Sequence, residues 1–170
     1  VGVSNECDYP ISVKDLPILT KPRFSSINSS QEIDISVQDL LKKGLSVYEV
    51  NTDLLKKLAP DLIITQAQCE ACAVSLNDVK EAVSDWVGNK PDIVSLWPNY
   101  LDEVWSDFER VGEKLNSSDS YLKFKSEIEK RLEKLKQKSQ QLMKRPSVVC
   151  VEWIDPLMIA ANWVPELVDI

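Results

Sequence analysis

Histidine is absent from the 170-residue chain. Its absence excludes Ser-His-Asp and Cys-His catalysis, the two-histidine zinc helix and any histidine proton relay. Only four glycines are present, and their spacing matches neither a phosphate-binding loop nor a dinucleotide fingerprint. No apolar run approaches the ~18 residues of a membrane span. What remains is carboxylate, thiol or tyrosine chemistry, or a role without catalysis, and we favour a protein that is not an enzyme.

The net charge and the length of the chain further limit which kinds of protein and partner fit the sequence. With 27 acidic against 20 basic residues, the net charge of −7 argues against nucleic acid or an anionic membrane surface as a partner. The apolar fraction of 44% and the charged fraction of 28% are typical of globular proteins. The length suffices for one sizeable domain or two small lobes. We expect a chain truncated at both ends, because residues 1–4 have the pattern of a strand already under way and residues 163–170 that of the first turns of a helix.

Three short apolar runs, each close behind a proline, predict strands at residues 61–65, 93–97 and 148–151, with residues 1–4 as a fourth. They are rich in β-branched residues and lack polar alternation, which is typical of strands covered on both faces in a parallel sheet. Helical spacing of apolar residues predicts helices at residues 31–43, 51–58 and 75–87, and residues 46–50 suit a short edge strand. Residues 61–97 therefore have the size and order of one βαβ unit.

Two further helices are predicted where this alternation stops, at residues 101–115 and 120–143. The second is long with a narrow apolar stripe, which suits a coiled-coil arm, a bundle helix or a spine between two lobes. Sustained heptads are missing, and a strand pattern follows at once, so we favour the spine. The predicted fold is α/β, with parallel-sheet lobes and a long inter-lobe backbone helix. Its parts are an N-terminal lobe at 1–98, a helical segment at 99–145 and the start of a C-terminal lobe at 146–170.

Polar and aromatic side chains follow the predicted strands, at the edge where open parallel sheets bind their ligands. Loops are commonly polar without binding anything, which is the simpler interpretation. The mixture nevertheless suits a large, partly apolar ligand with polar edges. The candidate ligand-binding residues are Asn5, Asp8, Tyr9, Gln66, Gln68, Trp97 and Trp153, with Trp163 as a further apolar wall.

The cysteines suggest an alternative function. Cys69 and Cys72 form a single C-x-x-C pair, and Cys7 would supply a third thiolate if the first two strand ends are neighbours. A thiol-based redox or metal-binding protein is therefore the alternative, although a structural zinc site usually needs two such pairs. A disulfide or free thiols are simpler interpretations. Cys150 lies within a predicted strand and suits a core position.

Several segments together resemble a known family. VGVSNECDYP at residues 1–10, LAPDLIITQ at 58–66, QCEACAV at 68–74 and VVCVEW at 148–153 occur in this order around the long predicted helix. The chain resembles the cobalamin- and iron-chelate-binding substrate proteins of ABC importers, the helical-backbone class of periplasmic binding proteins, and is most similar to cobalamin-binding members.

The resemblance implies two α/β lobes joined by one rigid helix, with a corrinoid or ferric chelate held in the cleft and delivered to an ABC permease. It implies no cofactor, and a periplasmic or extracytoplasmic location; a cytosolic one stays open because no signal peptide is visible. By position, Tyr9 would stack on the ligand ring, Trp153 matches an aromatic after the first strand of the second lobe, and Glu70 lies near the permease-docking glutamate. The family's first strand is absent here, and the sheet edge it would leave unpaired favours a homodimer.

Overall fold

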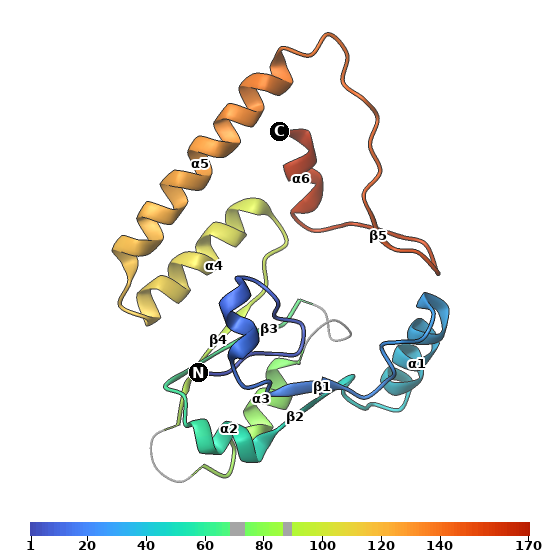
Figure 1. Cartoon of the computed structure of the whole chain (residues 1–170), viewed down its shortest axis with the longest axis vertical. Helices are drawn as coiled ribbons and strands as arrows, with labels where there is room; N and C mark the ends of the chain where they lie inside the picture. Colours follow the sequence, from blue (N-terminus) through green and yellow to red (C-terminus); the bar gives the residue numbers. More distant parts are fainter. Residues whose placement is uncertain (69–73, 87–89) are drawn as a thin grey trace. The chain divides into compact units, whose positions relative to one another are not determined.

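The computed structural model describes residues 1–68, 74–86 and 90–170 (Figure 1). Within these ranges the chain is a mixed α/β protein with short two-stranded sheets, one of which is parallel. It divides into two compact units, Val1–Leu96 and Trp97–Ile170, which we describe separately. Among the described helices, none combines the length and apolar character needed to cross a membrane.

The parallel pair of the first unit consists of β3 (Leu62–Gln66) and β4 (Asp92–Leu96), in register from Leu62 opposite Asp92 to Gln66 opposite Leu96. The connection carries α3 (Leu76–Ala82), which confirms the β-α-β order predicted for residues 61–97. Ser75 caps α3 by accepting the Asp78 N–H, while the Asp78 carboxylate accepts the Ser75 N–H. The helix ends at Ala82, so the prediction of a helix to residue 87 was too long.

A short antiparallel sheet precedes this pair. Its strands are β1 (Thr20–Pro22) and β2 (Tyr48–Val50), joined through α1 (Ser30–Lys42), and α2 (Thr52–Leu58) follows with Asn51 as its cap. The two helices and the edge strand β2 match the sequence predictions, whereas β1 was not predicted. Residues 1–4 form no strand of a sheet: Val3 makes one isolated parallel bridge to Ile18, ahead of a short 3-10 helix, η1 (Ile11–Asp15), in sequence order.

The core of the first unit combines residues of α2, α3 and the strands or their flanks. Its buried cluster combines Leu55 of α2 with Ala82 and Val83 at the end of α3. Side chains from the strands and their flanks pack against it, namely Leu19, Val50, Ile63, Trp86 and Ile93. One core therefore stabilises both small sheets, and it holds the parallel pair in place.

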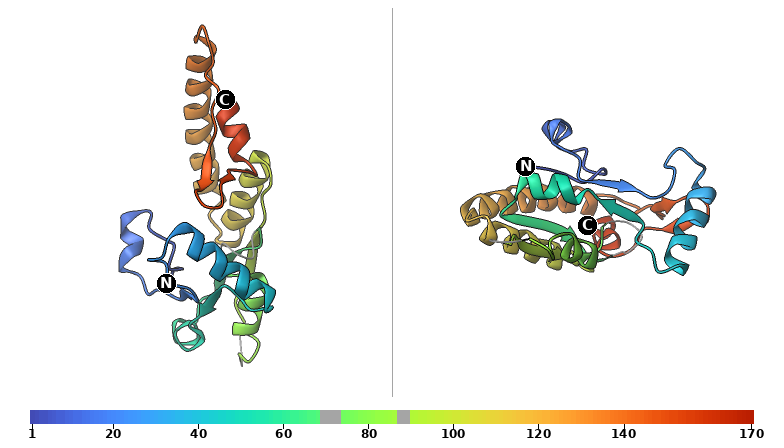
Figure 2. Two further views of the ribbon diagram at one scale, coloured as in Figure 1. Left: turned by 90° about the vertical axis from the view of Figure 1, so that its right-hand side faces the viewer. Right: turned by 90° about the horizontal axis from the view of Figure 1, so that it is seen from below.

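The second unit is built on a helical hairpin of α4 (Leu101–Lys114) and α5 (Ser118–Gln140), which lie side by side (Figures 1 and 2). Phe108 and Phe124 meet edge to face with ring centroids 5.4 Å apart, and the Tyr121 hydroxyl donates to the Trp105 carbonyl at 3.1 Å. Both helices lie close to their predicted positions. The predicted role of the second as an inter-lobe backbone helix is not confirmed.

Residues 148–151 were predicted to be a buried parallel strand, and that prediction was wrong. The strand β5 (Val151–Trp153) begins later and pairs antiparallel with β6 (Met158–Ile159). Val149 is 72% exposed and Val151 is 52% exposed. A short apolar run marks a strand but does not specify what covers it, and β6 is the one strand paired with β5 in the described part of the chain. The unit ends with α6 (Val164–Asp169).

Candidate functional site

Two glutamine side chains lie at the carboxyl end of the parallel pair, as predicted. Gln66 is the last residue of β3, and its Nε2 donates to Oε1 of Gln68 at 3.4 Å. The Ala67 N–H donates to the Leu96 carbonyl at 2.9 Å, which extends the pairing past the strand end. Both glutamines are partly buried. The fold therefore brings two amides together at the edge where open parallel sheets bind ligands.

Trp97 follows β4 directly, and its side chain is 63% exposed. Its backbone N–H donates to Oδ2 of Asp107 in α4 at 3.2 Å. The Asp107 carboxylate also forms an ion pair with Arg110, one turn further along the helix. Asp107 was not among the predicted site residues; its one signal in the sequence is an acidic residue beside the apolar stripe of α4, directly before Phe108.

The segment around Tyr9 combines an anchored residue with exposed ones. The Asn5 N–H donates to the Thr20 hydroxyl at 2.9 Å, and that hydroxyl donates back to Asn5 Oδ1 at 2.6 Å. The Asn5 side-chain amide donates to Oε1 of Glu6 at 2.6 Å. Asp8 is exposed, and Tyr9 is 88% exposed. Asn5 thus anchors this segment to β1, while Tyr9 points its ring into solvent.

The negative charge of Glu6 also affects the pKa of a buried tyrosine, Tyr48. Tyr48 in β2 is 8% exposed, and this burial raises the pKa of its phenol above 10.0, with a smaller contribution from the negative charge of Glu6. The segment carrying Tyr9 is therefore electrostatically coupled to β2.

The aromatic candidates of the second unit differ in their surroundings. Trp153 ends β5, is partly buried and donates its indole N–H to the Asp155 carbonyl at 3.0 Å. Trp163 is the N-cap residue of α6 and is also partly buried. Tyr9 and Trp153 belong to different units, so their predicted places around one ligand stay a prediction. Glu70, the predicted docking residue, lies outside the described residues.

The structure tests the thiol alternative only in part. Cys7 is exposed and free, with its Sγ 3.8 Å from the Ser4 hydroxyl, and Cys150 is free and partly buried. Cys69 and Cys72 lie outside the described residues. Over residues 1–68, 74–86 and 90–170, no three acidic or thiol side chains gather in a way that could hold a metal ion.

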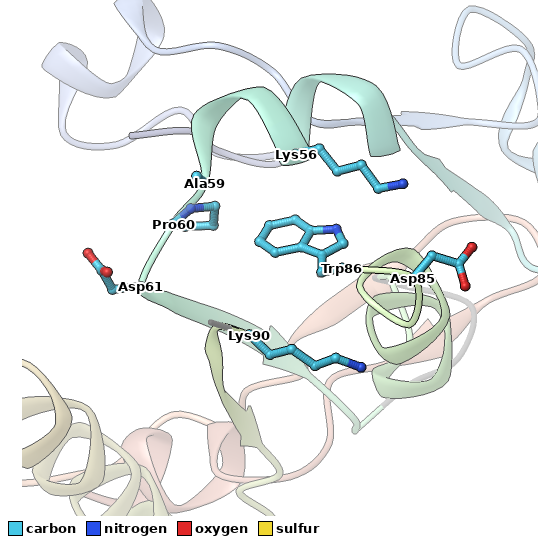
Figure 3. Close-up of a pocket in the computed structure, with 7 residues that line it drawn as sticks. All are labelled: Lys56, Ala59, Pro60, Asp61, Asp85, Trp86 and Lys90. Atoms are coloured by element: carbon cyan, nitrogen blue, oxygen red, sulfur yellow. The ribbon is translucent and has the colours of Figure 1, made fainter. Parts of the chain in front are cut away.

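A hollow of about 590 Å³ lies at the opposite, amino-terminal end of the parallel pair (Figure 3). The Trp86 indole occupies the middle of the view, with the lysine side chains on either side of it and the Asp61 carboxylate well apart from both ammonium groups. Two lysines and two aspartates balance each other in the lining, which contains none of the predicted ligand-binding residues. The lining consists of Lys56, Ala59, Pro60, Asp61, Asp85, Trp86 and Lys90.

Comparison of the chain with family models, with curated proteins and with solved structures finds no match in any of the three.

Proposed function

We propose that the chain is part of a substrate-binding protein that captures a corrinoid or a ferric chelate and delivers it to an ABC permease. In this proposal the ligand lies in a cleft between two α/β lobes, α5 is the backbone helix that joins them, and the protein performs no catalysis. The proposal extends to a periplasmic or extracytoplasmic location. It rests on the family resemblance of the sequence together with the chemistry of the strand ends.

The observation that carries the proposal is the exposure of two candidate aromatic side chains, Trp97 directly behind β4 and Tyr9 in the segment before η1. Trp97 is 63% exposed, and Tyr9 is 88% exposed. Exposed aromatic rings offer large apolar surfaces, and covering about 100 Å² of such surface contributes roughly 2.5 kcal/mol. A planar macrocycle is a ligand that can cover such rings, because it presents an extended apolar face.

The polar groups at the carboxyl end of β3 suit the rim of such a ligand. The Gln66 and Gln68 amides both donate and accept hydrogen bonds, so they complement amide or hydroxamate groups without requiring a particular charge. Few, well-placed polar groups around an apolar surface are typical of small-molecule sites. The amide pair thus supports recognition of a neutral, amide-bearing periphery.

Calorimetric titration of the full chain with cyanocobalamin, dicyanocobinamide and a ferric hydroxamate siderophore tests the proposal. We expect at least one of them to bind with micromolar affinity and Trp97→Ala to weaken that binding about tenfold, because the variant loses an apolar wall. Trp86→Phe is the matched control, since Trp86 packs against the core at the opposite end of the parallel pair. If none of the three ligands binds more tightly than about 1 mM, or ~4 kcal/mol, the proposal is wrong.

The same samples test the alternative of a thiol-based redox or metal-binding protein. Cys7 favours this alternative, because its thiol is free and exposed. A redox or metal-binding function requires bound metal in elemental analysis or thiols that react unusually fast with a disulfide reagent. We expect neither, together with binding of one of the three ligands.

A further inference from the structure

Asp107 stands apart from the other charged residues. Among the described residues it is the one charged or strongly polar side chain that is buried, with 8% of its surface exposed. Burying a carboxylate is costly unless its oxygens are paired and hydrogen-bonded. Asp107 therefore needs specific partners, and those partners show which part of the chain it holds.

The two carboxylate oxygens of Asp107 have different partners. Oδ1 forms the ion pair with Arg110, whose side chain is 51% exposed, so this contact lies near the surface. Oδ2 accepts the backbone N–H of Trp97, ten residues earlier and directly behind the last residue of β4. A hydrogen bond from a backbone N–H to a buried carboxylate is among the stronger ones in proteins. Asp107 thus fixes the first peptide group after the strand.

A second carboxylate of α4 holds the rest of this loop. Oε2 of Glu103 accepts the N–H of Asn99 at 2.6 Å and that of Tyr100 at 3.3 Å. Three of the backbone N–H groups between β4 and α4 are therefore bound by the helix that follows. The loop is held by its backbone, which leaves the Trp97 side chain free to stay 63% exposed.

We propose that Asp107 is the positioning residue for Trp97: through the Trp97 N–H it fixes the backbone from which the exposed indole projects toward a ligand. This inference deepens the proposed function and rests on it for the role of the indole. A ring held in place before binding loses less conformational freedom when a ligand covers it, so the hydrogen bond contributes to affinity without touching the ligand.

The structural test uses the full chain labelled with 5-fluorotryptophan and compares Asp107→Ala with Asp107→Asn. The fluorine resonance of Trp97 is assigned with Trp97→Phe, and hydrogen exchange of its amide is followed in parallel. We expect Asp107→Ala to shift that resonance and to speed exchange of the amide about tenfold, because the acceptor is lost. Asp107→Asn keeps an oxygen acceptor, so we expect it to retain the parent resonance and most of the protection.

Gly112→Ala is the matched control, because it perturbs the same helix at its contact with Tyr121 without touching Trp97. We expect it to lower stability and leave the Trp97 signals unchanged. If Asp107→Ala leaves both signals as in the parent, or if Gly112→Ala changes them equally, the inference is overturned. If Asp107→Ala fails to fold, the test rests on Asp107→Asn. The inference is then overturned if Asp107→Asn loses the parent Trp97 resonance and the exchange protection of the Trp97 amide.

The binding test uses whichever of the three ligands binds the parent. We expect Asp107→Ala to weaken binding about tenfold and Asp107→Asn to weaken it less. The positioning role is overturned if Asp107→Ala shifts the Trp97 fluorine resonance and speeds exchange of the Trp97 amide, but binds the ligand as tightly as the parent. If the parent binds none of the ligands, the proposed function and the ligand-facing role fail together, while the fluorine and exchange signals still decide whether Asp107 holds Trp97.

Discussion

Replacing Gly112 with alanine perturbs the α4–α5 hairpin where α4 packs against Tyr121 of α5. An alanine Cβ at this position would lie 3.0 Å from Cβ of Tyr121 and 3.7 Å from its Cγ. This is shorter than an ordinary carbon contact, so Tyr121 and the part of α5 that carries it would have to move away by a few tenths of an ångström. Tyr121 cannot avoid the contact by changing rotamer, because the clashing atom is its own Cβ, which is fixed to the backbone of α5.

The expected cost follows from two opposing effects. Overpacking of this kind costs about 1–3 kcal/mol, and the higher helix propensity of alanine returns about 1 kcal/mol. The displacement would also strain the hydrogen bond from the Tyr121 hydroxyl to the Trp105 carbonyl. We expect a net loss of up to roughly 2 kcal/mol in the free energy of unfolding, measured by urea denaturation followed by far-ultraviolet circular dichroism.

A control on the same helix separates the contact from a general effect of substitution. Glu109 is exposed on α4, so Glu109→Ala should change stability by no more than about 0.5 kcal/mol. A Gly112→Ala variant as stable as the parent, or more stable, would refute the reasoning. It would mean that the two helices separate at no cost and that the packing around Tyr121 does not limit stability.

Three further predictions concern the first unit. Ser75→Ala should lower the free energy of unfolding by about 1 kcal/mol in urea denaturation, because it removes the cap of α3, and an unchanged midpoint would contradict this. Because the folded-state pKa of Tyr48 is raised above 10.0, the unit should lose stability as pH rises from there through the folded pKa. Glu6→Gln should lower that pKa only slightly in an ultraviolet absorbance titration, since burial is the larger cause; a full return to 10.0 would contradict this.

The elements with strong local signals were predictable from the sequence. The apolar spacing of α1 and α4 fixes those helices locally, and the capping serine of α3 fixes where that helix begins, so these features follow without knowledge of the tertiary structure. The β3–β4 pair was also predictable, because two β-branched runs separated by a helix have few other ways to pair. By contrast, β1 contains Lys21 and Pro22 and becomes a strand only through pairing with β2.

The candidate site was predictable in its composition and not in its contacts. The order of residues behind β3 and β4 identified the Gln66–Gln68 pair and Trp97, because strand ends are set by local sequence. Asp107 was missed because an aspartate on an amphipathic helix normally faces water, and its bond to Trp97 depends on how the chain returns from the strand. The antiparallel pairing of β5 with β6 was missed for the same reason, since pairing direction depends on the turn between them.

The shared core of the first unit has a consequence for cooperativity. Leu19 and Val50 adjoin one sheet, Ile63 and Ile93 belong to the other, and all four pack against Leu55, Ala82 and Val83. The Asp78 carboxylate adds a second link, because it accepts the Ser46 hydroxyl from the segment before β2 as well as the groups of Ser75. Opening either sheet would thus expose the apolar surface that supports the other. Residues 1–96 should therefore melt in a single transition, with neither sheet surviving as a partly folded intermediate.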